Sequence, residues 1–393
     1  MNMALRRSVS TNPECGRPYL FVLLLVSALF NTAQATQVVS RVVAWGDLSY
    51  DLSFAPSSSA TPDSWQVAPG DFHSLLMRGD GSLFAWGDDR FNQTNVPALV
   101  QTLPVAQIAA GNIHNLALMR DGTVVAWGPS PGQYGDYGQC AVPAGLGPVA
   151  AVAAGAVHSL ALKTDGTVAA WGYNLSGQCN VPAGLSNVIA IAGGMYHSLA
   201  LQGDGTVVGW GDNQHGQTSI PADLSNVVAI AAGGFHNLAL KQDGSVVSWG
   251  TYGLAQVSVP SGLTNVVAIA TADYHSLALK ADGTLVTWGL NPAGQCNVPG
   301  GLTNIVSIAA RGGHSMVLVQ QASAAPPELS IVLSGANVVV SWPASTTGVV
   351  LQQTSELNPP NWTVVGNTAL SLNGQNQVTL SATDKMFFRL TPQ

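Results

Sequence analysis

The chain has 393 residues, room for two or three ordinary domains, and only 8% of them are charged, against about 25% in a typical soluble domain. Thirteen basic residues stand against twenty acidic ones, so no basic patch of the kind that binds nucleic acid is available, and we expect no nucleic-acid partner. Uncharged polar residues and glycine are expected to cover the surface.

The first 35 residues have the features of a secretory leader. Arginines precede an apolar run at Tyr19–Phe30, and Ala33–Ala35 fits the small-residue signal for cleavage. The run has about 12 residues, whereas a membrane-spanning helix needs about 20. We therefore expect residues 1–35 to be a signal peptide, cut near Ala35, and the mature chain to be secreted or held at the cell surface without a membrane span.

One unit is then repeated along most of the chain. A His recurs seven times from His73 to His314, in steps of 39 to 44 residues, and a Trp-Gly pair recurs seven times from Trp45 to Trp288. A fixed period of about 40 residues indicates a propeller, a solenoid or an array of repeats.

Each copy has the pattern of short antiparallel strands. In the copy Asn187–Gly211, Val188–Ala192 is a strand candidate, and two alternating runs, Ser198–Gln202 and Thr206–Trp210, flank the turn dipeptide Asp204-Gly205. A later segment ending in Val-Pro or Ile-Pro fits only an outer strand, because proline lacks a donor for the ladder. Three or four strands and no helical pattern predict one propeller blade per repeat.

The two repeat markers are out of phase at the ends of the array. The strand Val42–Gly46 has a Trp-Gly but no His before it, whereas His314–Val319 has no Trp-Gly after it. Pairing these two segments closes a ring without a free sheet edge. We therefore expect an all-β chain whose residues 36–320 form a seven-bladed β-propeller closed by an N-terminal strand.

A second, smaller domain is expected after the propeller. Residues 321–327 have the composition of a linker, and residues 328–393 contain six short alternating runs separated by turn residues, which predicts a small β-sandwich. Its Trp342-Pro343 on an early strand and its closing Phe387–Leu390 resemble the fibronectin-type-III-like modules that end many secreted bacterial proteins.

The repeat itself resembles that of a known family. The repeat pattern is Ala-Gly-Gly-x-His-Ser-Leu-Ala-Leu-Lys-x-Asp-Gly-Thr-Val-x-x-Trp-Gly, and Ala232–Gly250 follows it with Asn237 in place of Ser and Ser245 in place of Thr. This pattern resembles the regulator of chromosome condensation repeat, and copies cover about 70% of the chain. The resemblance implies a seven-bladed propeller. It leaves the function open, because members range from a guanine-nucleotide exchange factor to β-lactamase inhibitors, light sensors and binding platforms. The short loops and the leader depart from the exchange factor, so we transfer none of its residues.

The repeated residues are expected to be structural rather than catalytic. Each repeat His begins a strand, where its ring can bond a neighbouring blade's backbone, and seven such positions on a ring lie too far apart for one metal ion. The Asp of each Asp-Gly suits a turn, and the Trp side chains suit a core. Cys140, Cys179 and Cys296 are expected to be free, packed thiols. We expect no catalytic, cofactor or metal residues and no enzymatic activity.

Residues that vary between blades are the candidates for partner binding. They lie in loops between a Trp-Gly and the next Val-Pro, and additions at one place in a repeat map to one face of the ring. Aromatic side chains and arginine are the usual anchors of interfaces. The candidates are Tyr50, Phe54, Arg90, Phe91, Tyr134, Tyr137, Tyr173, His215 and Tyr252. A second aromatic set directly precedes the repeat His: Phe72, Tyr196, Phe235 and Tyr274.

These features favour an exported, non-enzymatic, monomeric scaffold that presents one propeller face to a protein partner. The alternative is a lectin-like propeller that binds glycans through the same loop aromatics. A guanine-nucleotide exchange factor is less favoured because the loops are short and the chain is expected to be exported, and a glycan-degrading enzyme is less favoured because no paired carboxylates stand out in the sequence.

Overall fold

A computed structural model of the chain describes residues 38–49, 52, 64–251, 253, 257–322, 329–334, 337–344, 349–354, 363–381 and 387–392. The leader expected at residues 1–35 lies outside this set, as do the candidate residues Tyr50, Phe54 and Tyr252. The described parts of Val39–Gln321 form one compact unit and those of Ala322–Gln393 form another.

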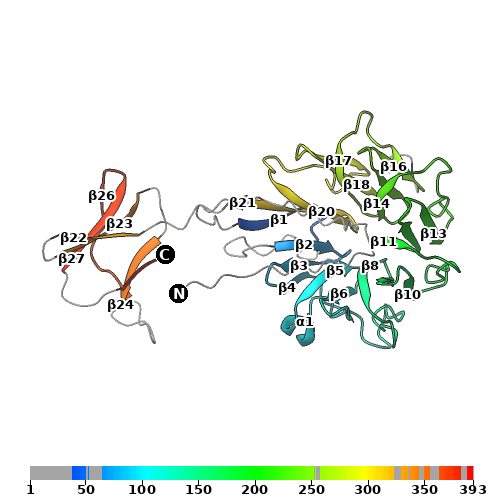
Figure 1. Cartoon of the computed structure of the whole chain (residues 1–393), viewed down its shortest axis with the longest axis horizontal. Coiled ribbons are helices and arrows are strands. Elements are labelled where there is room, and N and C mark those ends of the chain that lie inside the picture. The colour runs from blue at the N-terminus through cyan, green and yellow to red at the C-terminus, as the bar shows by residue number, and fades with distance from the viewer. Residues whose placement is uncertain are drawn as a thin grey trace, which may run out of the picture. The chain divides into compact units, whose positions relative to one another are not determined.

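Seven three-stranded antiparallel sheets make up the first unit (Figure 1), and each corresponds to one blade. The first six blades are β2 (Ser64–Pro69), β3 (His73–Arg78) and β4 (Leu83–Gly87); β5 (Val105–Ala110), β6 (Asn115–Met119) and β7 (Val124–Trp127); β8 (Val149–Ala154), β9 (His158–Lys163) and β10 (Val168–Gly172); β11 (Val188–Gly193), β12 (His197–Gln202) and β13 (Val207–Gly211); β14 (Val227–Ala232), β15 (Asn237–Lys241) and β16 (Val246–Trp249); β17 (Val266–Thr271), β18 (His275–Lys280) and β19 (Leu285–Gly289).

The seventh blade joins the two ends of the repeat array. It consists of β20 (Ile305–Arg311), β21 (His314–Ala322) and the N-terminal strand β1 (Val38–Gly46), in the order β1-β21-β20. The first strands of successive blades contact one another, and β20 of the last blade contacts β2 of the first. The predicted closure by an N-terminal strand is therefore confirmed.

Each hairpin turn has the geometry that its Asp-Gly predicts. Gly205 has φ +87°, a conformation that glycine adopts without strain. The side chain of Asp204 accepts the backbone N–H of Thr206 at 2.9 Å, and the same bond recurs at the five other Asp-Gly turns. The interpretation of these aspartates as turn residues is confirmed.

The hydrophobic core lies between neighbouring blades. At the interface of the third and fourth blades, Leu160 and Leu162 of β9 pack with Trp210 of β13. Both faces of the middle strand are covered in this way, so the first five residues of β12 are all buried rather than alternating. The seven repeat Trp side chains are only 6–7% exposed, which confirms that they belong to the core.

The structure differs from the sequence prediction at two places. The Val-Pro segments are not strands, although Val181 and Ile220 pack against the blade cores. Each blade therefore has three strands, because the proline offers no N–H for a fourth ladder. A short helix, α1 (Ala98–Thr102), lies between the first two blades where no helical pattern was expected. Five residues are too few for a periodic signal.

The second unit has the two sheets expected of a small sandwich. One contains β22 (Ser330–Ser334), β23 (Asn337–Pro343), β27 (Gln375–Ser381) and β26 (Leu370–Leu372), and the other contains β25 (Thr363–Val364), β24 (Val349–Thr354) and β28 (Phe387–Pro392). Val340, Trp342, Leu351, Val365 and Val378 form their shared core. Among the described residues, no helix has the length and hydrophobicity needed to cross a membrane.

Candidate binding face

The variable loops and the segments before each His emerge at the same end of the propeller. His197 at the start of β12 pairs with Gly211 at the end of β13, and the last residue of β11 pairs with Ser198. The Asp-Gly turns lie at the opposite end of the strands. We call these two ends the loop face and the turn face.

Buried glutamines fix the variable loops on the loop face. The side-chain oxygen of Gln217 accepts the backbone N–H of His215 at 2.8 Å, and Gln93, Gln139, Gln178 and Gln295 make the same bond in their own loops. All five glutamines are at most 2% exposed. A buried side chain with few alternative rotamers holds each loop in one conformation.

The same glutamines tie each loop to the following blade. The backbone oxygen of Gln217 accepts both the indole N–H of Trp249 at 3.1 Å and the side-chain amide of Asn237 at 2.8 Å. The side-chain oxygen of Asn237 in turn lies 2.7 Å from Nε2 of His197 in the preceding blade. A repeat of this network connects neighbouring blades around most of the ring.

The repeat His residues therefore act between blades, with one correction to the prediction. In six of the seven, Nε2 contacts a Ser or Asn side chain of the next blade rather than its backbone. Burial lowers the pKa of all seven, to about 4 for His197 and about 3 for His158, so the rings are neutral at physiological pH.

At the ring closure this network is interrupted. Within the described residues, Nε2 of His314 in the last blade and Oγ of Ser74 in the first blade have no hydrogen-bond partner. The first blade also lacks a glutamine at the loop position, and Trp86 donates to the backbone oxygen of Leu52 instead, at 3.3 Å. The closure thus depends on the β1–β21 pairing, on core packing and on an ion pair between Arg311 of the last blade and Asp71 of the first, at 2.9 Å.

Replacing Gln178 with Ala is expected to loosen the loop at residues 173–179. The substitution removes the acceptor for the Ser176 N–H and should cost about 1–2 kcal/mol in unfolding free energy. Hydrogen exchange of the loop amides should accelerate. Gln202→Ala is the matched control, because its side-chain bond to Ser186 is exposed. Unchanged exchange in Gln178→Ala would contradict the role of the glutamine.

The structure brings most of the described candidate residues into three aromatic clusters. Ring centroids are 6.5 Å apart for Phe91 and Tyr134. In the second cluster, Tyr173 lies 5.1 Å from Tyr137 and 5.7 Å from Tyr196. In the third, Phe235 lies 5.2 Å from His215 and 5.9 Å from Tyr274. Loop aromatics thus meet the set that precedes the repeat His, and each cluster joins neighbouring blades.

Arg90 projects from the same face and is mostly exposed. Its Nε lies 3.0 Å from a carboxylate oxygen of Asp88 two residues earlier. An ion pair with one exposed partner contributes little to stability, so this arrangement positions the guanidinium at the surface rather than holding the fold together.

Two exposed aliphatic residues on this face were not among the sequence candidates. Leu175 and Leu290 lie in loops that correspond to those of Tyr137 and His215. The prediction selected only aromatic residues and arginine, so it missed these leucines. Their position in the variable loops is the sequence feature that could have identified them. Their exposed side chains add to the apolar surface that the aromatic residues of the loop face present.

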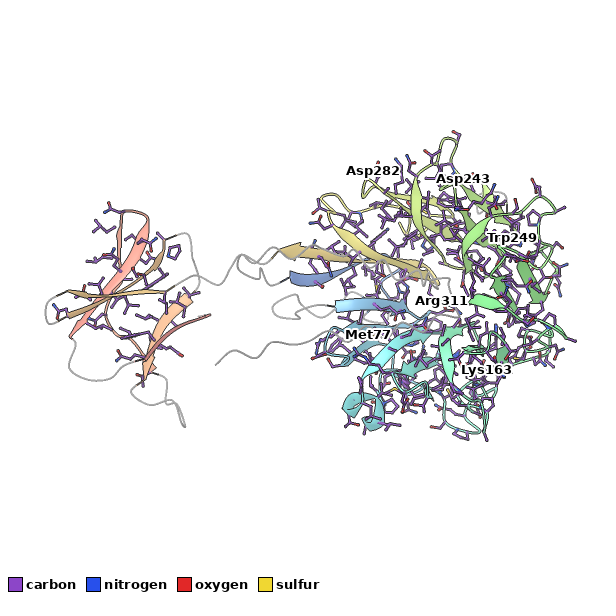
Figure 2. All side chains as sticks on the ribbon, viewed as in Figure 1. Met77, Lys163, Asp243, Trp249, Asp282 and Arg311 are labelled. Carbon is purple, nitrogen blue, oxygen red and sulfur yellow. The ribbon has the colours of Figure 1, made fainter. Side chains whose placement is uncertain are left out.

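A polar cluster at the centre of the loop face was also missed. Arg311 occupies the position at which most repeats have Gly, and Figure 2 shows it near the middle of the propeller. Its guanidinium lies 2.9 Å from Asp71 and 3.2 Å from Asn112, in the first two blades, and 3.5 Å from the backbone oxygen of Ala154. Burial and the Asp71 carboxylate raise the pKa of Asp273 nearby.

The three cysteines outside the leader are free and partly buried. Burial raises the pKa of Cys140 to about 12 and that of Cys179 to about 11, and it also raises the pKa of Cys296. The thiol form therefore dominates at neutral pH, as expected for packing residues.

Six segments match the model of the regulator of chromosome condensation (RCC1) repeat, at residues 66–93, 105–139, 149–178, 188–217, 227–251 and 266–295. The chain belongs to the RCC1 repeat family. Five of the six matched segments run from the first strand of a blade to the loop glutamine that follows its Trp-Gly, and the fifth ends at Thr251. An RCC1 repeat here is therefore a blade together with most of the loop that follows it. The seventh blade is divided between the two ends of the array.

Solved RCC1 propellers share this fold. Prp20p from Saccharomyces cerevisiae is 21% identical, with 74% of this chain and 93% of that chain covered and a TM-score of 0.62. Yeast RCC1 (Prp20) bound to Kap60 is 20% identical, with 81% of this chain and 97% of that chain covered and a TM-score of 0.63. Human WBSCR16 is 22% identical, with 71% of this chain and 98% of that chain covered and a TM-score of 0.56. At these identities the likeness shows the fold alone. Among curated proteins, none matches the sequence significantly.

Proposed function

We propose that this chain is an exported, non-enzymatic scaffold that binds a protein partner on the loop face of its propeller. The observation that carries the proposal is a group of apolar side chains exposed on loops that the buried glutamines hold in one conformation. Tyr134 and Leu175 are each 85% exposed, Tyr137 is 45% exposed and Leu290 is 43% exposed. Aromatic anchors on preformed loops lose little conformational entropy on binding, which favours an interface.

Two further observations support a binding role. The repeat His rings are buried, and their pKa values, about 4 for His197, make them weak bases, while the Cys thiols stay protonated at neutral pH, so neither set supplies an accessible general base or a thiolate nucleophile. Prp20p has been studied for its binding to Gsp1p and histones, and yeast RCC1 has been solved bound to Kap60. Export is inferred from the leader at residues 1–35, and a monomer from the closed ring, whose sheets have no free edge at the closure.

The direct test is a pull-down with residues 36–393 from the native secretome and cell-wall extract. Replacing Tyr134, Tyr137 and Tyr173 together with Ala is expected to reduce capture of the partner at least about tenfold, the effect of about 1.4 kcal/mol. Leu99→Ala is the matched control, because Leu99 is an exposed apolar residue of α1, outside the loop face. Retained capture in the triple variant would show that another face binds.

A glycan is the second candidate, because the exposed ring of Tyr134 also suits stacking on a sugar. Including free sugars in one lane of the pull-down separates the two proposals. Capture that free sugars release would favour the lectin-like propeller, whereas saturable capture that they leave unchanged would favour the protein scaffold.

A further inference from the structure

The two faces of the propeller differ in their charge balance. On the turn face, seven aspartates stand beside six basic side chains, including all three lysines of the propeller. Lys163, Lys241 and Lys280 lie within 4.0 Å of a turn aspartate. On the loop face, two arginines, Arg90 and Arg311, stand against seven aspartates among the described residues. These are Asp47, Asp71, Asp88, Asp89, Asp136, Asp212 and Asp273, of which Asp273 is only partly ionised at neutral pH because burial raises its pKa to about 7.

Both arginines of the loop face already have a carboxylate partner. Arg90 pairs with Asp88 and Arg311 with Asp71, at 3.0 and 2.9 Å. Within the described residues, Asp47, Asp89, Asp136 and Asp212 have no Lys or Arg partner. Hydrogen bonds stabilise the charged form of two of them: the Ser49 side chain and backbone lower the pKa of Asp47, and the backbone N–H groups of Gly138 and Gly132 lower the pKa of Asp136. The face therefore carries excess negative charge.

These aspartates lie in the same loops as the aromatic clusters. Asp89 is two residues from Phe91, Asp136 directly precedes Tyr137, and Asp212 is three residues before His215. The faces of aromatic rings attract cations, and a neighbouring carboxylate adds to that attraction. Lys and Arg side chains also have apolar stems that pack well on Tyr and Leu.

We infer that the partner presents a basic protein segment, rich in Lys or Arg, to the loop face. This inference rests on the proposed scaffold function and specifies its partner. The excess of aspartates would steer such a segment to the face, and the ring clusters would hold its side chains. An acidic segment or an anionic glycan would meet uncompensated carboxylates over the same surface.

The test uses residues 36–393 and a fluorescent peptide that alternates lysine with serine. Counterpart peptides carry glutamate or glutamine in place of lysine. Fluorescence anisotropy is expected to show binding of the lysine peptide alone, weakened as ionic strength rises. The variant D89N/D136N/D212N should bind it about tenfold more weakly, since each removed charge contributes up to about 0.5 kcal/mol.

The control variant D121N/D165N/D204N removes the same charge from the turn face and should change binding by less than about twofold. Asparagine keeps one acceptor oxygen for the local N–H bonds in both variants. In the loop-face variant its NH2 group replaces the oxygen that accepts from the Gly132 N–H and the oxygen that accepts from the Gln217 side chain. At the position of Asp89, other blades already use Asn174, Asn213 and Asn291 for the same bond. The melting temperature of the turn-face variant should stay close to that of the parent, and that of the loop-face variant should fall by about 2–4 °C for each lost bond of about 1 kcal/mol.

Three outcomes would overturn the inference: equal losses in both variants, equal binding of the glutamine peptide, or preferred binding of the glutamate peptide. The pull-down separates this failure from failure of the scaffold function. A captured partner that requires the three tyrosines but binds through an acidic or neutral segment would leave the scaffold intact and reject the basic segment. Capture that ignores the tyrosines would reject the loop face for both.

Discussion

Acidification to about pH 5 is expected to unfold the propeller before its carboxylates titrate. The seven repeat His residues have pKa values lowered to about 3 or 4 by burial, whereas in the unfolded chain they titrate near 6.5. Below that value the unfolded chain binds protons that the folded chain excludes, so stability falls as pH falls. Each His costs about 1.4 kcal/mol per pH unit, and seven together approach the whole stability of about 5–15 kcal/mol.

Circular dichroism and tryptophan fluorescence across a pH series would locate this transition. Calorimetry should also record uptake of close to one proton per repeat His on unfolding near pH 5.5. The C-terminal unit is an internal control, since all eight His residues of the chain lie between His73 and His314. A midpoint below about pH 4 would assign acid unfolding to the carboxylates and contradict the role of the histidines.

Deleting residues 36–46 should prevent the propeller from folding stably. The deletion removes Trp45, whose indole donates to Gln295 at 2.9 Å, and Val42, which packs at the interface with the first blade. A buried Trp alone is worth about 3–5 kcal/mol, and β21 would also lose its ladder with β1 and become a sheet edge. Loss of the cooperative melting transition is the expected result.

A rescue variant keeps this experiment specific. Moving residues 36–46 from the N-terminus to a position behind Ala322, through a flexible linker, retains the strand and should restore the melting transition. A deletion variant that melts at the parent's temperature would mean that β1 is not required for closure, despite its pairing with β21.

The blades could be predicted from the sequence because one local pattern of strands and turns occurs seven times at a nearly constant spacing. The dipeptide Asp204-Gly205 favours a hairpin turn through its own local conformation. The unpaired strand Val42–Gly46 can pair with only one blade of the array, the one whose last strand is missing. In contrast, α1 was missed because five residues carry no period. The Val-Pro segments look like strands because apolar residues do pack there, yet strand assignment also requires a ladder.

The candidate site was predicted only in part for a different reason. Loop position and residue type identified Tyr137 and Tyr173 as candidates. Their contact depends on how neighbouring blades are placed around the ring, which cannot be predicted from a local sequence pattern. The buried glutamines recur in the sequence, yet their side-chain bonds are visible only once the loop is folded. Arg311 was not singled out from the sequence, because a single residue in place of a glycine does not indicate its three partners, which lie about 160 to 240 residues away.

The placement of β21 between β20 and β1 has a mechanical consequence. The chain leaves the propeller through the end of this strand, so a pulling force on the C-terminal unit acts on β21 along its length. Hydrogen bonds on both sides of the strand would then be loaded together in shear rather than opened one after another. A propeller held by a partner and pulled from its C-terminal end is therefore expected to resist tension at the blade that also closes its ring.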